Sequence, residues 1–516
     1  MHAVKYIVPL RVVLPLLSVY LIISAFGLYY HALWLDEAQH FLIGRDSDSL
    51  GSLYYNMRYD GHPRLWDALL YMVTHYITTG YAGLQVLHLL ISTSAMFVFL
   101  RYAPFALVTK IIIISGYYFL FEYNLISRNY ALGILFLFIV CTLLRDPVRH
   151  QLLIGVMLVL LCNTHLFFAF AAIGIFICLL PAFTREKNRR NAGFFLFTAL
   201  FLAGVVSAII QTRTPAEDNC YQVRPGEWLS VKNLSFAATG LVKGWLPIPR
   251  IPNERFWNTF WVDTVAIPVR IILFVFFLFF PALLLRKHMR ALLFYYSSLS
   301  LLFAFLVVTQ ISATRYFGMA YVLFLAACWM AGNVFSMENM PGRAGVKTLF
   351  RVSLYSILSI QVVISVYALV QDFTRPFSES DNTVRYIRTH QLVDQAIVVD
   401  GYNAGPVLSA YLGKKVFYLD IGREGSYCTW KKSYFPVPRK SIGQEMAQSA
   451  FLQGMDKFVL VSNRQMDMDM IRSGDSLFRF TPLNSFRNSM ILSENYFIYQ
   501  ATRREGGKNL KCIVYE

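Results

Sequence analysis

The sequence predicts an α-helical polytopic membrane protein with an α/β domain after its last membrane helix. Of the 516 residues, 56% are hydrophobic and only 15% are charged, and the mean hydropathy is +0.48. Soluble domains of this length contain far more charge. Long apolar runs fill residues 1–371, whereas residues 372–516 are polar enough to fold in water. Composition and its change along the chain therefore indicate the fold class.

Eleven apolar segments are expected to cross the membrane, and twelve or thirteen would also fit the pattern. A further segment, Leu65–Thr79, is short and contains Asp67 and His75, so we interpret it as an interfacial or re-entrant helix. A cleavable signal peptide is the alternative for the first segment. The expected spans are residues 7–30, 84–100, 105–121, 130–144, 151–163, 165–182, 192–212, 262–285, 291–310, 314–333 and 347–371.

The net charge of +17 is explained without a nucleic-acid partner. Many basic residues lie in short connections at alternate ends of the spans, as the positive-inside rule predicts for cytoplasmic loops facing anionic lipids. This places residues 31–64, 213–261 and 372–516 on the opposite, extracytoplasmic side. The clusters are Arg101 and Lys110; Arg145 and Arg149; Arg185, Lys187, Arg189 and Arg190; Arg286, Lys287 and Arg290; and Arg343, Lys347 and Arg351.

Residues 372–516 alternate β-rich runs with helical stretches, which is typical of an α/β domain with a largely parallel sheet. The expected strands are Ala396–Asp400, Lys415–Leu419 and Lys457–Val461, and the expected helices are Ala404–Leu412 and Ile442–Gly454. One disulfide remains an open alternative among the outer cysteines Cys220, Cys428 and Cys512.

Ionisable side chains gather at the outer ends of several spans. Burying them beside a membrane is costly unless they are compensated, so convergence on one site is the simplest explanation. Carboxylates can accept a proton from a hydroxyl, and cationic side chains can bind a phosphate. The residues are Asp36 and Glu37; Asp60, His62 and Arg64; Glu122, Arg128 and Tyr130; His165; Lys243; and Arg315 and Tyr316.

Each of these residues also has a purely structural interpretation. An acidic pair can cap an interfacial helix, a histidine can satisfy backbone groups in a turn, and an arginine at a helix end can snorkel to the interface. These alternatives concern Asp36 with Glu37, His62, His165 and Arg315, together with a structural ion pair between Glu122 and Arg128. The residues are therefore more informative as a set than singly.

The motifs, in their order along residues 1–335, resemble those of the GT-C glycosyltransferases that use polyprenyl-phosphate sugars. The nearest group is the protein O-mannosyltransferase-like branch, which includes the lipid A aminoarabinose transferases. Its Asp-Glu loop is matched by Leu35–Ala38, and its His-Pro-Pro motif is similar to Gly61–Trp66, although Arg64 replaces the second proline. Ile126–Leu132, Thr164–Phe167 and Arg315-Tyr316 resemble its later motifs.

The resemblance implies a GT-C fold and transfer of a sugar, with inversion, from undecaprenyl phosphate or a similar lipid. The reaction would take place at the outer face of a bacterial cytoplasmic membrane, in the cell envelope. Asp36 is then the candidate general base and Glu37 its partner. The phosphate candidates are Arg128, Arg315, Lys243 and Arg64, and the candidate cavity residues are Asp60, His62, Glu122, Tyr130, His165 and Tyr316.

Some members of that family use a divalent cation such as Mg²⁺ or Mn²⁺ and others do not. If a cation is used here, Asp36 and Glu37 are its candidate ligands. The expected partners are the lipid-linked donor, membrane lipids and an acceptor glycan, lipid or protein. We expect residues 213–261 and 372–516 to select the acceptor.

Two other classes of protein stay open at this point. A transporter or flippase of lipid-linked saccharides explains the spans, the outer cations and a lipid groove without any chemistry, and it must expose its site on both sides of the membrane. A membrane anchor that presents residues 372–516 to a partner predicts that Asp36 is dispensable.

Overall fold

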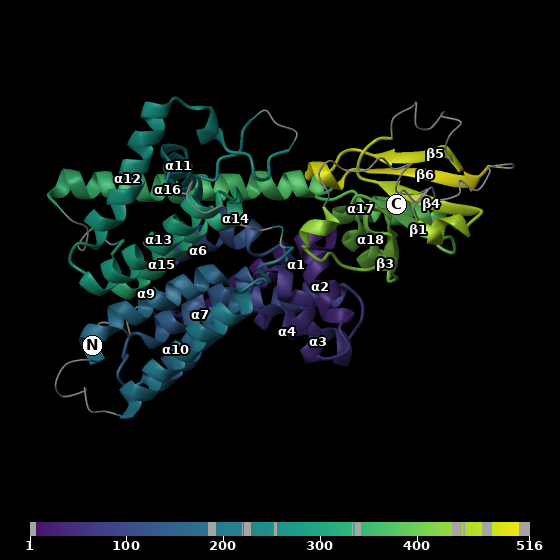
Figure 1. Cartoon of the computed structure of the whole chain (residues 1–516). Coiled ribbons are helices and arrows are strands. Elements are labelled where there is room, and N and C mark those ends of the chain that lie inside the picture. Colours follow the sequence, from purple (N-terminus) through teal and green to yellow (C-terminus); the bar gives the residue numbers. More distant parts are fainter. Residues whose placement is uncertain are drawn as a thin grey trace.

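The computed structural model describes residues 7–183, 192–218, 220, 229–251, 255–332, 334–335, 342–435, 446, 449–466 and 477–504. A helical bundle forms one end of the molecule, and a β-sheet with its covering helices forms the other (Figure 1). The long helix α16 (Ala344–Thr374) runs along the bundle and leads into the sheet domain. This architecture confirms the predicted fold class.

Seven of the described helices are long and apolar enough to cross a membrane. Large apolar side chains on their outer faces, such as Ile22, Phe26 and Ile272, are exposed, as a lipid environment requires. The chain is therefore a multi-pass membrane protein. Besides α16, these helices are α1 (Leu10–Tyr30), α5 (Ala82–Tyr102), α10 (Ala192–Thr212), α12 (Ile267–Leu285), α13 (Met289–Thr309) and the continuous pair α14 (Thr314–Phe317) and α15 (Met319–Ala331).

Shorter apolar helices complete the bundle. They are α6 (Leu107–Ile114), which precedes a π-helical turn at Tyr118–Glu122, and α7 (Tyr130–Leu143), α8 (Gln151–Thr164) and α9 (Leu166–Phe183). Each of the expected spans thus contains at least one helix. The expected interfacial segment forms α4 (Leu65–Tyr76). The basic cluster at residues 185–190 lies outside the described residues.

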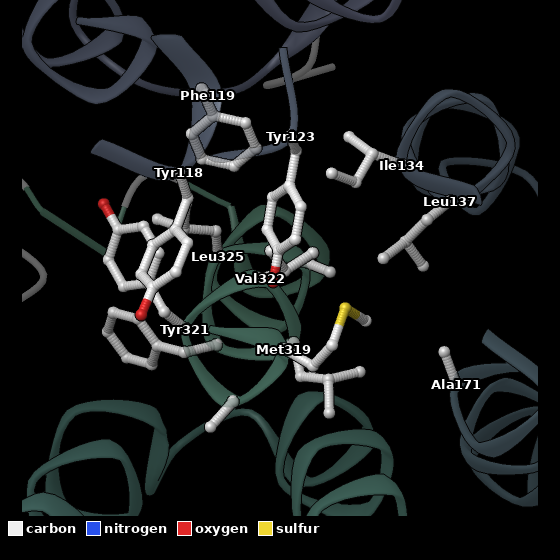
Figure 2. Close-up of a cluster of buried hydrophobic side chains, with 14 of the residues drawn as sticks. Tyr118, Phe119, Tyr123, Ile134, Leu137, Ala171, Met319, Tyr321, Val322 and Leu325 are labelled. Carbon is white, nitrogen blue, oxygen red and sulfur yellow. The ribbon is translucent and has the colours of Figure 1, made fainter. Parts of the chain in front are cut away.

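The centre of the bundle is formed by α14 and α15, which are 83% buried, compared with 22% for α1 and α12. Figure 2 shows Tyr118 and Tyr123 beside Tyr321 of α15. The Tyr118 ring lies so close to Gly318 that a Cβ atom there would be 2.1 Å from it. Because the Tyr123 hydroxyl also donates to the carbonyl of Arg315 at 2.7 Å, this aromatic core holds α14 in place.

Four helices lie in the long connections of the bundle. Three of them, α2 (Leu35–Arg45), α3 (Leu50–Asn56) and α4, connect α1 to α5, and α11 (Val231–Trp245) connects α10 to α12. The first turn of α2 contains Asp36 and Glu37, where acidic side chains favour the positive end of the helix. Glu37 also accepts the backbone N–H of Trp34 at 3.2 Å, so part of the capping interpretation is confirmed.

The C-terminal domain contains a six-stranded mixed sheet in the order β3-β2-β1-β4-β6-β5. Its described helices are α17 (Ser380–Thr389), α18 (Gly405–Leu412) and α20 (Ala450–Gln453). The strands are β1 (Ile397–Asp400), β2 (Val416–Tyr418), β3 (Arg423–Gly425), β4 (Lys457–Ser462), β5 (Phe478–Phe486) and β6 (Tyr496–Arg503).

The expectation of a largely parallel sheet is wrong. Only β1 pairs in parallel, with β2 and β4, whereas the other three strand pairs are antiparallel. Short connections join β2 to β3 and β5 to β6, and a short connection permits only antiparallel pairing. Residues 442–445 and 447–448 of the expected helix Ile442–Gly454 lie outside the described residues, and its end forms the short helix α20. Cys512 also lies outside them, while Cys220 and Cys428 are free thiols.

The C-terminal domain is bound directly to α2. The Glu494 carboxylate accepts the backbone N–H of Leu35 at 2.8 Å. The Gln39 side chain makes two hydrogen bonds, both 2.7 Å long, with the backbone carbonyl and N–H of Cys428. Because α18 also packs against α2, the helix is held between the bundle and the sheet domain.

Candidate active site

A cavity of about 320 Å³ opens beside the first two turns of α2. Seven of the residues singled out in the sequence line it, so the structure brings most of the expected set together: Asp36, Asp60, His62, Arg128, His165, Arg315 and Tyr316. The other polar lining residues are Gln39, His40, Thr214, Thr309 and Trp430, and apolar ones include Leu166, Phe305 and Ile311.

Two arginines bind Asp36. Nη1 of Arg128 and Nη2 of Arg315 each lie 2.9 Å from Oδ2 of this carboxylate. The Asp36 side chain is 22% exposed, whereas those of Arg128 and Arg315 are only 5% and 12% exposed. Charge-assisted hydrogen bonds of this kind are roughly twice as strong as neutral ones, and they stabilise the ionised carboxylate. Below, Asp36, Arg128 and Arg315 are called the cavity cluster.

Aromatic rings surround one of these arginines and leave it spare donors. The guanidinium carbon of Arg315 lies 5.1 Å from the ring centre of Trp34, 5.2 Å from that of Tyr316 and 5.8 Å from that of Trp257. Nε of Arg315 and Nε of Arg128 are buried and have no hydrogen-bond partner among the described residues. Buried donors are normally paired, so each of these two atoms has an unused capacity to donate a hydrogen bond.

Three imidazoles line the cavity. The ring centres of His40 and His62 are 6.0 Å apart, and those of His62 and His165 are 5.3 Å apart. Nδ1 of His40 lies 2.6 Å from a carboxylate oxygen of Asp67. Nδ1 of His165 accepts a backbone N–H, which leaves the ring proton on Nε2, 3.3 Å from the Tyr130 hydroxyl.

The C-terminal domain contributes one wall of the cavity. The indole N–H of Trp430 donates to Oδ1 of Asp60 at 3.0 Å. Gly61 follows with a positive φ of 66°, which glycine adopts without strain, and this turn presents Asp60 and His62 to the same space. The cavity is therefore complete only when the two regions of the protein are in contact.

The environment shifts the pKa values of three lining groups. Burial alone would raise the pKa of Asp36, but Arg128 and Arg315 hold that pKa below its ordinary value of 3.8. Burial raises the pKa of Asp60 to about 6. Burial, with Arg128 nearby, lowers the pKa of His62 to about 3. At neutral pH, Asp36 is thus ionised and His62 is neutral.

Glu37, the neighbour of Asp36 in the sequence, does not line the cavity. It is fully buried, and its carboxylate accepts the backbone N–H of Ser127 at 2.5 Å. Its other oxygen lies 3.3 Å from Nε2 of His31, whose Nδ1 is 2.7 Å from Oδ2 of Asp372. We call His31, Glu37 and Asp372 the buried cluster. It ties α2 to the loop that carries Arg128 and to the end of α16.

Two expected phosphate ligands lie elsewhere. Nζ of Lys243 is 2.9 Å from a carboxylate oxygen of Asp263, and its side chain does not line the cavity. The guanidinium of Arg64 lies 4.8 Å from the ring centre of Tyr54, also outside the lining. Arg64 nevertheless lies near the cavity, since it follows His62 by two positions and the charge of Asp60 acts on it, whereas Lys243 is paired with Asp263.

Two expected lining residues stand behind the cavity wall. Glu122 accepts a hydrogen bond from Trp257 Nε1 at 3.0 Å, and Trp257 in turn contacts Arg315. Tyr130 contacts His165 with its ring and hydroxyl. Tyr130 therefore supports a lining side chain directly, whereas Glu122 acts through Trp257 on the lining residue Arg315.

Sequence reasoning missed Gln39, His40 and Trp430. The first two were within reach, because residues three and four positions after Asp36 share its face of a helix. Nothing local in the sequence connects Trp430 to Asp60, since the two are far apart in the chain. In the sequence, Asp67, the partner of His40, stands out only as a charge within the short apolar segment Leu65–Thr79.

A second groove, of about 420 Å³, lies between α11, α12 and α13. Its lining is almost entirely apolar and includes Leu241, Phe274, Leu278, Leu299, Phe303 and Val307. Helix α13 contributes Phe303 and Val307 to this groove and Phe305 and Thr309 to the cavity. The apolar groove and the polar cavity thus share one helix.

The expected acidic ligands do not fit a divalent cation. Among the described residues, no group of three or more His, Cys, Asp or Glu side chains could hold a metal ion. Asp36 is already compensated by two arginines, and Glu37 by backbone N–H groups and His31. Mg²⁺ prefers several oxygen ligands that carry uncompensated charge, and these two carboxylates do not provide them.

No protein-family model matches the sequence, and no curated protein matches it either. Among solved structures, the chain is similar to the crystal structure of ArnT from Cupriavidus metallidurans bound to undecaprenyl phosphate. The similarity covers 96% of this chain and 98% of that chain, with 12% sequence identity and a TM-score of 0.48.

Proposed function

We propose that the protein is an integral membrane glycosyltransferase of the GT-C type. It transfers a sugar from a polyprenyl-phosphate donor to an acceptor hydroxyl, with inversion at the anomeric carbon. The observation that carries this proposal is the cavity cluster, in which one ionised carboxylate and two arginines with spare Nε donors face the same cavity. The order of the sequence motifs supports it.

The chemistry needs both signs of charge at one place. The acceptor oxygen attacks the anomeric carbon, the bond from that carbon to the phosphate oxygen breaks, and polyprenyl phosphate leaves with the electron pair. Asp36 accepts the hydroxyl proton, and Arg128 and Arg315 bind the phosphate as its negative charge grows. When a phosphate takes over the arginines, the Asp36 carboxylate becomes a stronger base, because its charge is no longer compensated.

The other residues have supporting roles in this proposal. Glu37 is a positioning residue, since it holds the loop of Arg128 from the buried side. The apolar groove between α11, α12 and α13 accommodates part of the donor's hydrocarbon chain, and apolar lining suits such a ligand. Lys243 and Arg64 do not line the cavity and have no part in binding the phosphate in this proposal.

The proposal also includes the two domains of the chain and the side of the membrane on which the second domain lies. Residues 1–371 form the catalytic membrane domain, and residues 372–516 form a domain on the extracytoplasmic side of a bacterial cytoplasmic membrane. The basic connections predicted to be cytoplasmic support this orientation. A cysteine introduced at Asp381, in a variant that lacks Cys220 and Cys512, should react with an impermeant thiol reagent added outside intact cells.

The decisive experiment uses purified wild-type protein and the variant Asp36→Asn in nanodiscs. Each is incubated with a panel of polyprenyl-phosphate sugars and a membrane extract, and loss of each donor is followed by mass spectrometry. We expect wild type to consume a donor and Asp36→Asn to bind it without consuming it. Asp381→Asn, which changes an exposed carboxylate on α17, is the matched control and should behave as wild type.

Two outcomes would contradict the proposal. If wild type consumes no donor, a flippase becomes the better explanation, and movement of a fluorescent lipid-linked saccharide across reconstituted vesicles would demonstrate it. If Asp36→Asn consumes the donor as fast as wild type, Asp36 has no catalytic role.

A further inference from the structure

The positive charges that line the cavity are matched to one phosphate and no more. Among the described lining residues, Arg128 and Arg315 are the only side chains with a permanent positive charge. They already share Asp36, so the cavity cluster has a net charge of about +1. A sugar-phosphate diester carries one negative charge, which this cluster neutralises. A second phosphate, on an acceptor, would find no cation left.

The imidazoles do not supply that cation. His62 lies close to both arginines, which disfavour a second positive charge beside them. His165 receives a backbone N–H on Nδ1 and is therefore a neutral ring. The ring of His40 is bonded to the Asp67 carboxylate, so the pair has no net positive charge in either state of the ring.

Away from the arginines the cavity has the chemistry that recognises hydroxyl groups. Asp60, Gln39 and Trp430 line it together, and the Trp430 indole is hydrogen-bonded to the Asp60 carboxylate. A carboxylate accepts hydrogen bonds from hydroxyl groups, and an amide can both donate to them and accept from them. A large aromatic ring provides an apolar face on which a sugar ring packs. Phe435 stacks on Trp430 with ring planes 9° apart, which restricts the position of the indole.

The wall that carries Trp430 is fixed at several points. Gln39 holds Cys428 through two hydrogen bonds, and the Trp430 carbonyl accepts the backbone N–H of Cys220 at 3.3 Å. Asp218 accepts hydrogen bonds from the backbone and the hydroxyl of Ser433, each 2.6 Å long. Both extracytoplasmic segments expected to select the acceptor therefore meet at this wall.

We propose that the acceptor is a neutral carbohydrate whose sugar ring binds against Trp430, with its hydroxyls bonded to Asp60 and Gln39. This inference rests on the proposed function and specifies the acceptor of the same site. One acceptor hydroxyl loses its proton to Asp36 and forms the new glycosidic bond, while polyprenyl phosphate leaves toward Arg128 and Arg315. Trp430 is a specificity-determining residue supplied by the C-terminal domain.

The first test measures binding and does not depend on the donor. The full chain in nanodiscs is titrated with methyl glycosides of hexoses, pentoses and N-acetylhexosamines, and with the corresponding hexose 6-phosphates, using saturation-transfer NMR. We expect at least one neutral glycoside to bind and its phosphorylated counterpart to bind about tenfold more weakly or not at all. Tighter binding of the phosphorylated sugars would overturn the proposal.

The second test uses variants of the wall. Trp430→Ala should raise the KM for the neutral acceptor about tenfold and leave kcat within about threefold, because the ring binds the acceptor without joining the chemistry. Trp430→Phe keeps the ring and should recover most of the affinity, which separates loss of stacking from loss of folding. Lys431→Ala, next in the chain but outside the cavity lining, is the control and should match wild type.

The results distinguish the two proposals. If donor is consumed but Trp430→Ala has the wild-type KM, the acceptor assignment is wrong and the transferase assignment stands. If Lys431→Ala weakens acceptor binding more than Trp430→Ala, an anionic acceptor is indicated and the proposal is overturned. If no donor is consumed, the proposed function fails whatever the binding data show.

Discussion

Asp36 and Glu37 are adjacent in the sequence and yet belong to two different charged regions. Asp36 belongs to the cavity cluster, whose carboxylate is 22% exposed and shared by two arginines. Glu37 belongs to the buried cluster, in which the side chains of Glu37 and His31 are completely inaccessible. The first region can exchange its partners with a ligand, whereas the second cannot.

The comparison separates chemistry from architecture. A charge that must act on a ligand needs partners that the ligand can replace, and the cavity cluster has them. A charge without access to solvent or ligand serves to hold segments together, and breaking it leaves an uncompensated ion in a dry interior. Mutations in the two clusters should therefore have opposite signatures in activity and in stability.

The largest effect is expected at Asp36. Asp36→Asn removes the proposed proton acceptor while retaining the shape of the side chain, so donor turnover should fall by about 10³-fold or more. The folded protein should persist, as judged by size-exclusion profile and melting temperature. If turnover by Asp36→Asn stays within tenfold of wild type, the proposed difference between a catalytic cavity cluster and a structural buried cluster is contradicted.

Each arginine of the cavity cluster should come next. Arg128→Lys or Arg315→Lys preserves the charge but removes the planar fork, and loss of one preorganised donor to a leaving group costs about 10²-fold in kcat. Single-turnover kinetics with saturating donor would measure it. The matched control is Arg385→Lys on α17, where the ion pair is exposed.

Glu37→Gln should show the opposite signature. It keeps acceptor atoms for the Ser127 N–H but loses the charge that faces His31, which should lower the free energy of unfolding by about 1–3 kcal/mol. Activity per folded molecule should stay within about tenfold of wild type. Thermal unfolding measures the predicted loss of stability, and turnover divided by the amount of folded protein measures the predicted activity. A variant that is stable but inactive would show that Glu37 is catalytic.

The buried cluster also predicts a pH dependence of stability. Burial alone would lower the pKa of His31, but Asp372 and Glu37 outweigh it and raise the pKa from 6.5 to about 10. Because the folded value is the higher one, the stabilisation is fully present below about pH 6.5 and is lost as the pH rises through about 10. The difference in melting temperature between wild type and His31→Asn should therefore become smaller as the pH rises from about 6.5 to about 10. A constant difference would contradict the assignment.

The smallest effect concerns Asp60 at the wall of the cavity. Burial raises its pKa to about 6, and the hydrogen bond from Trp430 opposes that rise. If the ionised form binds acceptor hydroxyls, the KM for the acceptor should fall about threefold as the pH rises past 6. Trp430→Phe should move this transition to higher pH, and Asp60→Asn should abolish it.

Much of the candidate site was predictable because its residues are unusual where they stand. Charged groups such as Asp36, Arg128 and Arg315 beside apolar spans are costly unless they are used, and that cost makes them visible without a structure. The helical spacing of Asp36 and His40 was also present in the sequence, although it was not used. Of the strands that the sequence did not reveal, β3 and β5 form the edges of the sheet and have mostly exposed side chains, whereas β6 lies between β4 and β5.

The sequence by itself determined the membrane class, the positions of the helices and the set of ionisable groups, because hydropathy and charge are properties of local segments. Only the tertiary structure decided that Asp36 faces a cavity while Glu37 is buried, and that Lys243 pairs with Asp263 instead of joining the arginines. It also brought Trp430 to Asp60, which lies 370 positions earlier in the chain. Which charges meet depends on the packing of distant helices, and no local pattern encodes that packing.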